Sequence, residues 1–169
     1  SGFTVVTPSC ETRVTSFTDA SVPNAGSITS WQWNFGDPAS GPLNTSTLQN
    51  PTHIFSTAGT YTVSLVVTTD KGCVSTTPPQ QVVINARPLA GFILPEVCLS
   101  DTYAQFTDTS SVDAPDFIQA WNWNFGDGTF GTDENPIHLY ADTGQFCITL
   151  TVQTAQGCQD TTTHCLYIF

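Results

Sequence analysis

Hydrophobic residues occupy alternate positions in several short segments of the chain, which is the period of a β-strand with one buried face. In residues 60–67, Tyr61, Val63, Leu65 and Val67 share one parity, and Thr, Ser and Val lie between them. Residues 145–152 repeat the pattern with hydrophobic side chains at matching positions, namely Phe146, Ile148, Leu150 and Val152. Both segments therefore predict strands that pack one side against a hydrophobic core.

Further strand-like segments follow one another along the chain, separated by Gly, Pro, Asn and Asp. No window shows the period of an amphipathic helix with end caps. In the first half we expect strands near residues 3–8, 13–18, 28–35, 52–56, 60–69 and 80–85. In the second half we expect them near residues 90–94, 103–107, 117–125, 137–140, 145–154 and 163–168. Six or seven short strands in about 85 residues indicate an antiparallel β-sandwich.

A seven-residue aromatic motif occurs twice, as WQWNFGD at residues 31–37 and WNWNFGD at residues 121–127. Other segments recur in the same order, including NPTH and NPIH, GTY and GQF, and two Gly-Cys pairs. A period of about 85 to 90 residues suits a small domain that folds by itself rather than a solenoid repeat. We therefore predict two modules, residues 1–85 and 86–169.

The charge balance excludes several classes of partner. The chain has three Lys and Arg residues against 14 Asp and Glu, and its net charge is −11. Such a chain repels nucleic-acid phosphates and anionic lipids, so we expect no nucleic acid among its partners. No stretch approaches the roughly 20 apolar residues of a membrane span, so we expect no direct membrane insertion.

The six cysteines show no Cys-x-x-Cys spacing. This pattern favours disulfides and an oxidising, extracytoplasmic location. Because the chain starts directly with strand-like residues, we interpret it as a piece of a larger exported protein.

The sequence lacks the motifs of common catalytic sites, including the Gly-x-Ser-x-Gly elbow, the His-Glu-x-x-His helix and phosphate-binding glycine loops. A carboxylate pair for glycoside hydrolysis would need a cleft, which sandwiches of this size seldom provide. We therefore expect a protein that is not an enzyme.

The aromatic motif has two interpretations. Trp31, Trp33 and Phe35 share a parity, so on a strand they point to one face. Sandwiches commonly bury one tryptophan in mid-strand, so we expect Trp33 and its repeat Trp123 in the cores. Trp31 and Trp121 lie nearer the strand start, where they either pack against the core or stack on sugar rings as ligand-binding residues.

The ordered motifs, from W-x-W-N-F-G-D through N-P-x-H to Gly-Cys, resemble the PKD (polycystic kidney disease) repeat twice, over nearly the whole chain. The resemblance implies an all-β fold of two consecutive immunoglobulin-like, PKD-type antiparallel β-sandwiches with about seven strands each. The chain departs from the family's pattern at Asn34 and Asn124, where Asp is common, and at Pro38, where Gly is usual. The second module keeps that glycine as Gly128.

The cysteine placement and the Thr-rich, Lys-poor composition are similar to PKD arrays in very large bacterial adhesins. Among these are the gliding-motility adhesins that Bacteroidetes export by the type IX route. The resemblance implies a stiff spacer or adhesive stalk at the cell surface, with neighbouring PKD modules and a surface polysaccharide or protein as partners. The alternative is a carbohydrate- or protein-binding accessory module of a secreted hydrolase.

The duplication narrows the pairing of the cysteines. Two cysteines in the first module have counterparts in the second, which favours one bridge within each module. The two cysteines without counterparts lie in the last two strands, which should pair as a hairpin. The expected disulfides are Cys10–Cys73, Cys98–Cys158 and Cys147–Cys165.

The Gly-Asp pair that ends each aromatic motif also has two interpretations. Its carboxylate can accept backbone N–H bonds and stabilise a turn. Alternatively it can bind calcium, which takes about six to eight oxygen ligands and which some relatives of this fold bind. The candidate calcium ligands are Asn124, Asp127, Asp133, Glu134 and Asp108 in the second module, and more weakly Asn34, Asp37 and Asp19 in the first.

One histidine follows an Asn-Pro pair at the same position in each module, His53 and His138. A single histidine per module does not build a zinc site by itself. We expect each ring to form a hydrogen bond that supports the tryptophan strand or the Gly-Asp turn.

Overall fold

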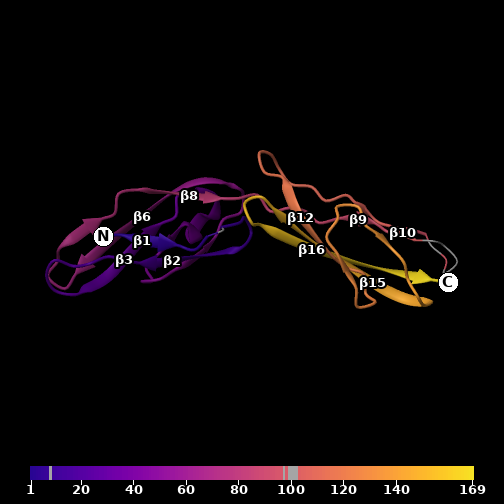
Figure 1. Ribbon diagram of the computed structural model, residues 1–169. Coiled ribbons are helices and arrows are strands. Elements are labelled where there is room, and N and C mark those ends of the chain that lie inside the picture. The colour runs from indigo at the N-terminus through magenta and orange to yellow at the C-terminus, as the bar shows by residue number, and fades with distance from the viewer. Residues whose placement is uncertain (8, 97, 99–102) are drawn as a thin grey trace. The chain divides into compact units, whose positions relative to one another are not determined.

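The computed structural model describes residues 1–7, 9–96, 98 and 103–169. It divides into two compact units, Ser1–Ala86 and Arg87–Phe169. The described elements of both units are antiparallel β-strands and one short helix (Figure 1). The predicted all-β fold class is confirmed.

The first unit contains two sheets with antiparallel pairs throughout. One sheet has the order β1-β2-β5, with β1 at Phe3–Val5, β2 at Val14–Asp19 and β5 at Thr52–Ile54. The other has the order β4-β3-β6-β7, with β4 at Thr45–Ser46, β3 at Ile28–Asn34, β6 at Gly59–Thr69 and β7 at Val74–Thr76. A further strand, β8 (Gln80–Ile84), pairs with β6.

The second unit is built around a sheet in the order β13-β12-β15-β16. Its strands are β13 (Phe130–Gly131), β12 (Ile118–Asn124), β15 (Gly144–Thr154) and β16 (Gln159–Ile168). Two short antiparallel pairs join β10 (Ala104–Gln105) to β14 (Ile137–His138) and β11 (Thr107–Asp108) to β9 (Phe92–Ile93).

Each unit has a hydrophobic core of its own around one tryptophan. Trp33 is 2% exposed and packs against Phe17 with ring centroids 5.7 Å apart. Trp123 is 0% exposed and packs against Phe106 at the same distance. The predicted core positions of both tryptophans are confirmed. The alternating residues of β6 and β15 fill the cores beside them, namely Val63, Leu65, Val67, Ile148, Leu150 and Val152.

The sequence did not predict the 3₁₀ helix η1 (Pro38–Asn44) of the first unit. Proline has a fixed φ and no N–H, so Pro38 suits the first helical position. Ser40 fixes the start of the helix by donating from its amide and its hydroxyl to the Asp37 carbonyl, at 3.1 and 2.7 Å. The second unit has a tight turn there instead, in which Gly128 adopts a φ of 92°.

The two units also differ in their last strands. Pro78 and Pro79 separate β7 from β8 in the first unit, because proline cannot donate to a sheet. In the second unit β16 is continuous and pairs with β15 from Gly144↔Ile168 to Gln153↔Gln159. It begins four residues earlier than the predicted strand at 163–168.

Candidate functional site

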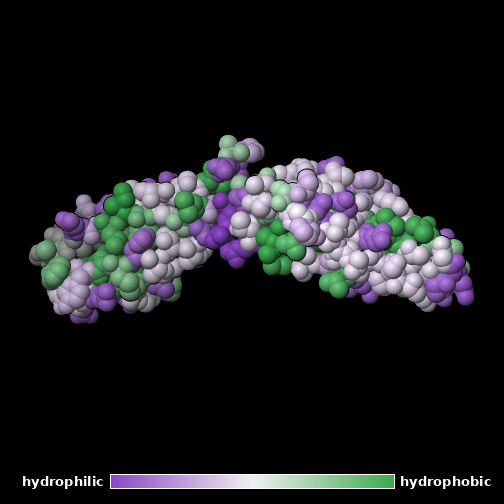
Figure 2. Space-filling view, turned by 180° about the vertical axis from the view of Figure 1, so that it is seen from behind, coloured by the Kyte–Doolittle hydropathy of each residue, from purple (hydrophilic) through white to green (hydrophobic). Residues whose placement is uncertain are grey.

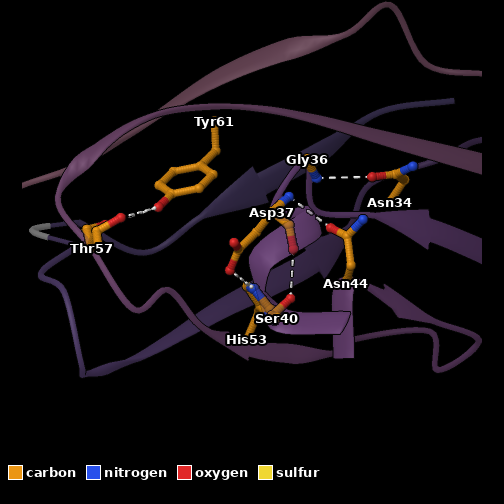
Figure 3. A network of polar contacts seen from close by, with 8 residues as sticks. All are labelled: Asn34, Gly36, Asp37, Ser40, Asn44, His53, Thr57 and Tyr61. Carbon is orange, nitrogen blue, oxygen red and sulfur yellow. Dashed lines mark hydrogen bonds and ion pairs between the residues drawn. The ribbon is translucent and has the colours of Figure 1, made fainter. Parts of the chain in front are cut away.

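A network of polar contacts is centred on Asp37 in the turn that ends β3 (Figure 3). Asn34 Oδ1 accepts a hydrogen bond from the Gly36 amide at 2.8 Å, and Asn44 Oδ1 accepts one from the Asp37 amide at 2.7 Å. Asp37 Oδ2 lies 3.1 Å from His53 Nε2, and both side chains are buried. The polar groups of this turn therefore bind one another.

The second unit has the same turn in a more open form. Asp127 Oδ1 accepts hydrogen bonds from the amide and the hydroxyl of Thr129, at 3.0 and 2.6 Å. Asp127 Oδ2 lies 2.7 Å from His138 Nε2. The side chains of Asp127 and His138 are 20% and 14% exposed, against 2% and 3% for Asp37 and His53. Water therefore reaches this pair but not its counterpart.

The hydrogen bonds also affect the ionisation of Asp127. Partial burial acts to raise its pKa, but the hydrogen bonds from Thr129 and His138 outweigh burial and hold the pKa below its ordinary value. Asp127 is thus bound in the turn as a carboxylate.

Both histidine rings stack on the phenylalanine of the aromatic motif. The ring centroids of His53 and Phe35 are 4.3 Å apart with an interplanar angle of 9°, and those of His138 and Phe125 are 4.1 Å apart at 5°. Each histidine joins the core aromatic residues to the Gly-Asp turn. The expected supporting role of the histidines is confirmed.

The outer tryptophans form a second recurring contact with an aspartate. Trp31 Nε1 donates to Asp19 Oδ2 at 2.7 Å, and Trp121 Nε1 donates to Asp108 Oδ2 at 2.8 Å. Both tryptophans are half-buried and pack against the cores. Of the two interpretations of these tryptophans, core packing therefore accounts for the buried part of each indole ring.

Asp19 and Asp108 also hold the backbone beside them. Asp19 Oδ1 accepts from the Ser21 amide at 2.9 Å, and Asp108 Oδ1 accepts from the Ser110 amide at 3.0 Å. Burial acts to raise the pKa of Asp19, but the hydrogen bonds from Ser21 and Trp31 outweigh it and hold the pKa below its ordinary value. Each carboxylate thus ties the tryptophan strand to the neighbouring turn.

The candidate calcium ligands of the second unit are divided among these contacts. Asp108 binds Trp121 and Asp127 binds His138. Asp133 is exposed and contributes its backbone carbonyl to Trp123 Nε1 at 2.9 Å. Within the described ranges 1–7, 9–96, 98 and 103–169, no three His, Cys, Asp or Glu side chains form a group that suits a metal ion.

The predicted Cys10–Cys73 disulfide is wrong. Cys73 is an exposed free cysteine, and Cys10 takes part in a disulfide. Cys10 pairs with Asn85 in a parallel bridge, next to the end of β8, where Ile84 pairs with Gly59 at the start of β6. Cys73 follows the other end of β6, whose 11 residues span about 33 Å. Disulfides join Cα atoms about 4.4–6.8 Å apart, so these cysteines lie too far from each other.

The predicted Cys98–Cys158 disulfide is not formed either. Cys158 is fully buried and disulfide-bonded, whereas Cys98 is exposed and is not joined to it. Asp160, two residues after Cys158, accepts a hydrogen bond from the Ala90 amide at 3.0 Å. Phe92 of β9 lies against His164, with ring centroids 5.0 Å apart. From Ala90 the chain therefore runs along β16 away from Cys158 before it reaches Cys98. Cys147 and Cys165 face each other in β15 and β16 and form the third expected disulfide.

Two threonines that were not among the predicted site residues hold the turns before the last strands. Thr69 Oγ1 accepts from the Cys73 amide, and Thr154 Oγ1 accepts from the Cys158 amide, both at 3.2 Å. The sequence contains a repeat that could have predicted this role, because a threonine lies four positions before the Gly-Cys cysteine in both modules. Asn44, the partner of Asp37, has no such repeat and gave no signal.

The surface carries hydrophobic side chains in separate patches between polar ones (Figure 2). One groove of about 510 Å³ lies on the outer face of β12 and β15. Its lining is free of charged side chains and comprises Ala120, Trp121, Asn122, Asn124, Phe130, Thr149, Thr151, Gln153 and Gln159. The described part of the chain contains no helix with the length and apolar composition needed to cross a membrane.

Two antiparallel units, each closed around a tryptophan with internally bonded polar turns, define immunoglobulin-like β-sandwich modules. The chain belongs to the PKD domain family, whose model matches residues 3–84 and 85–168. PKD domains are non-catalytic modules, and the described fold contains no catalytic domain.

The chain is similar to short parts of larger proteins. It is 42% identical over 40 residues to collagenase ColA of Bacillus cereus, which covers 24% of this chain and 4% of the relative. It is 33% identical over 63 residues to the microbial collagenase of Vibrio alginolyticus. This match covers 37% of this chain and 8% of that relative. The PKD1 domain of Vibrio anguillarum Epp is a solved structure with 27% identity and a TM-score of 0.46, covering 50% of this chain and 95% of that domain.

Proposed function

We propose that the chain is a force-bearing spacer in a larger exported protein, namely a stalk of the kind found in bacterial cell-surface adhesins, including those of gliding motility. Its partners are neighbouring PKD modules of the same chain, and it lies outside the cytoplasm. The observation that carries this proposal is the position of the chain ends within the first unit.

The chain comes into the first unit at one end and leaves at the other. At the leading end, Ser1 lies beside Ser75, with their hydroxyl oxygens 3.3 Å apart, close to the end of β6 at Thr69. At the trailing end, Asn85 lies beside Cys10, close to the start of β6 at Gly59. The length of β6, about 33 Å, separates the two ends. Tension along the chain therefore acts along the strands.

The first and last segments of the unit are joined by a short parallel patch at the trailing end. The Asn85 amide donates to the Ser9 carbonyl at 2.8 Å, and the Glu11 amide donates to the Asn85 carbonyl at 3.1 Å. Because the segments run parallel, a pull on the chain ends shears both hydrogen bonds at once instead of opening them one after another. This arrangement suits a module that bears load.

Single-molecule pulling on the 169-residue chain from its two ends tests the proposal. Asn85→Pro removes the amide donor of the parallel patch and should lower the unfolding force of the first unit. Asn85→Ala keeps that amide and loses only the longer bond from Asn85 Nδ2 to the Ser9 carbonyl, at 3.3 Å. It is therefore the control for the backbone bond and should unfold at a force closer to wild type than Asn85→Pro does. Equal forces for all three chains would contradict the force-bearing role.

A carbohydrate- or protein-binding accessory module of a secreted hydrolase is the second candidate. The collagenase relatives favour it, as does the uncharged groove on β12 and β15 with Phe130 exposed at its rim. Amide and hydroxyl side chains beside an aromatic ring suit a neutral polysaccharide. Co-sedimentation with insoluble polysaccharides and collagen tests it. Phe130→Ala should abolish binding and the exposed Val83→Ala should not, whereas equal retention of both would reject this groove.

Calcium binding by the second unit stays a prediction. Its ligands would be Asn124, Asp127, Asp133, Glu134 and Asp108, whose oxygens are of the type that calcium prefers. If calcium binds, the thermal unfolding midpoint of the oxidised chain rises by several degrees in millimolar calcium relative to EDTA. Asp127→Asn should abolish the rise. An unchanged midpoint in the wild-type chain would contradict calcium binding, and the acids would then serve only in the hydrogen bonds of the turns.

A further inference from the structure

The turn that carries Cys73 has the same geometry as the turn that carries Cys158. In the first unit the Gly72 amide donates to the Thr69 carbonyl at 2.9 Å, and the Thr69 amide donates to the Cys73 carbonyl at 2.9 Å. In the second unit the corresponding distances, for Gly157, Thr154 and Cys158, are 2.9 and 2.8 Å. The two cysteines therefore occupy one structural position in the PKD module.

Their sulfur atoms are nevertheless in different states. Cys158 is 0% exposed and disulfide-bonded, whereas Cys73 is exposed and free. Because the turns agree, the turn itself does not account for this difference. What Cys73 lacks is the partner that its counterpart has.

The surface around Cys73 has the character of a protein interface. Cys73 lines a groove of about 410 Å³ at the leading end of the first unit, together with Ser1, Pro23 and Ile28. Val22 and Val74 also line it and are 82% and 65% exposed. Its lining includes no charged side chain. Exposed apolar side chains beside uncharged polar ones, here including Asn24 and Ser75, suit a surface that contacts another protein.

The position of Cys10 indicates what kind of partner fits. Each end of the first unit carries one cysteine, with Cys73 at the leading end and Cys10 at the trailing end. A PKD module of this kind that is docked by its trailing end against the groove brings a cysteine toward Cys73.

We propose that Cys73 is a covalent docking site for the trailing end of another PKD module, whose cysteine at the position of Cys10 forms a disulfide with it. The proposal rests on the spacer function and deepens it, because such a bond ties successive modules together at their ends. The groove of Pro23, Val22 and Val74 receives the docked module and Cys73 fixes it.

Disulfide formation here is an exchange with a disulfide oxidant of the exported protein's compartment. The Cys73 thiolate attacks the oxidant, forms a mixed disulfide and releases one thiolate. The thiolate of the partner cysteine then attacks Cys73 Sγ and releases the second. The two cysteines lose two electrons and two protons, and the oxidant becomes two thiols.

A three-module chain tests the proposal. In it, a copy of residues 1–86 precedes the complete 169-residue sequence, which places an added trailing end before the original Cys73. The chain is oxidised in a glutathione buffer, alkylated under native conditions and digested without reduction. Cleavage after Arg13 releases the added copy of Cys10 in a short peptide that differs from the original one. Mass spectrometry should find this peptide linked to the original Cys73.

Alkylation rates provide the second readout. The original Cys73 should react at least tenfold more slowly in the three-module chain than in the 169-residue chain. Cys10→Ser in the added copy is the matched control and should restore fast alkylation. Fast alkylation without the substitution, or chains joined through two copies of Cys73, would overturn the proposal. The pulling experiment does not involve Cys73, so its failure and this one are distinguishable.

Discussion

At the scale of single residues, the acids and histidines of the repeated motif act within the fold. Asp37 and Asp127 each bind a histidine that stacks on a core phenylalanine. The sequence placed these residues together in the chain but left two interpretations open, turn stabilisation and calcium. Hydrogen-bond geometry distinguishes the contacts that form, and it depends on side chains from separate strands. For this reason spacing alone did not decide between the two.

The Asp37–His53 contact should contribute more to stability than its repeat. Asp37→Ala leaves His53 buried without this partner, which costs about 1–3 kcal/mol. In Asp127→Ala, water can replace the lost carboxylate at the partly exposed His138, so the loss should be smaller. Urea unfolding of both variants measures the difference. Equal losses would show that burial of the first pair has no energetic consequence.

Acid should destabilise the second unit through Asp127. The folded-state pKa of Asp127 lies below the ordinary value of 3.8, so its contribution to stability is present above that pH. It is lost as the pH falls below about 3.8 through the folded-state pKa. Thermal unfolding between pH 6 and pH 2 measures this loss. Asp127→Asn does not titrate and should flatten the decline, whereas an unchanged slope would contradict the assignment.

At the scale of elements, hydrophobic alternation predicted the long strands closely and several short ones, but it missed the short strands β4, β7 and β13. The predicted segments 60–69 and 145–154 differ by one residue from β6 and β15. The helix η1 is too short to show a period, and residues 159–162 at the start of β16 have no apolar alternation. They become strand because β15 offers them hydrogen-bond partners along its full length. Cross-strand pairing of this kind is not local in sequence.

The Gly-Asp turn has a backbone requirement that explains its glycine. Gly36 has a φ of +70°, and an added Cβ would lie 2.4 Å from the Thr62 carbonyl oxygen. Gly36→Ala should therefore lower the free energy of unfolding by about 1–2 kcal/mol, because alanine is strained in the left-handed conformation. The clash with the Thr62 backbone should lower it further. Gly72→Ala is the matched control, because Gly72 has a φ of +76° with open space around its Cβ position. Chemical unfolding should rank Gly36→Ala as clearly the more destabilising, and the reverse order would contradict this explanation.

At the scale of the whole molecule, the duplicated sequence corresponds to two hydrophobic cores rather than one. Residues of the first core come from Ser1–Ala86 and those of the second from Arg87–Phe169. The repeat predicts modules of residues 1–85 and 86–169, and the compact units of the structure are Ser1–Ala86 and Arg87–Phe169. The repeat gave the wrong partners for Cys10 and Cys158, because Cys10 and Cys73 align with second-module cysteines without revealing that they lie at opposite ends of a unit. The Cys147–Cys165 disulfide was predicted from hairpin pairing instead, and it forms.

The central claim is that the chain is built from two self-contained PKD modules whose motif residues stabilise the fold. Calorimetric unfolding of the oxidised 169-residue chain, with Trp33→Ala and Trp123→Ala, tests this claim most directly. Two transitions are expected, and each substitution should lower the temperature of one transition and leave the other at its wild-type temperature. A single transition that moves as a whole with either substitution would contradict it.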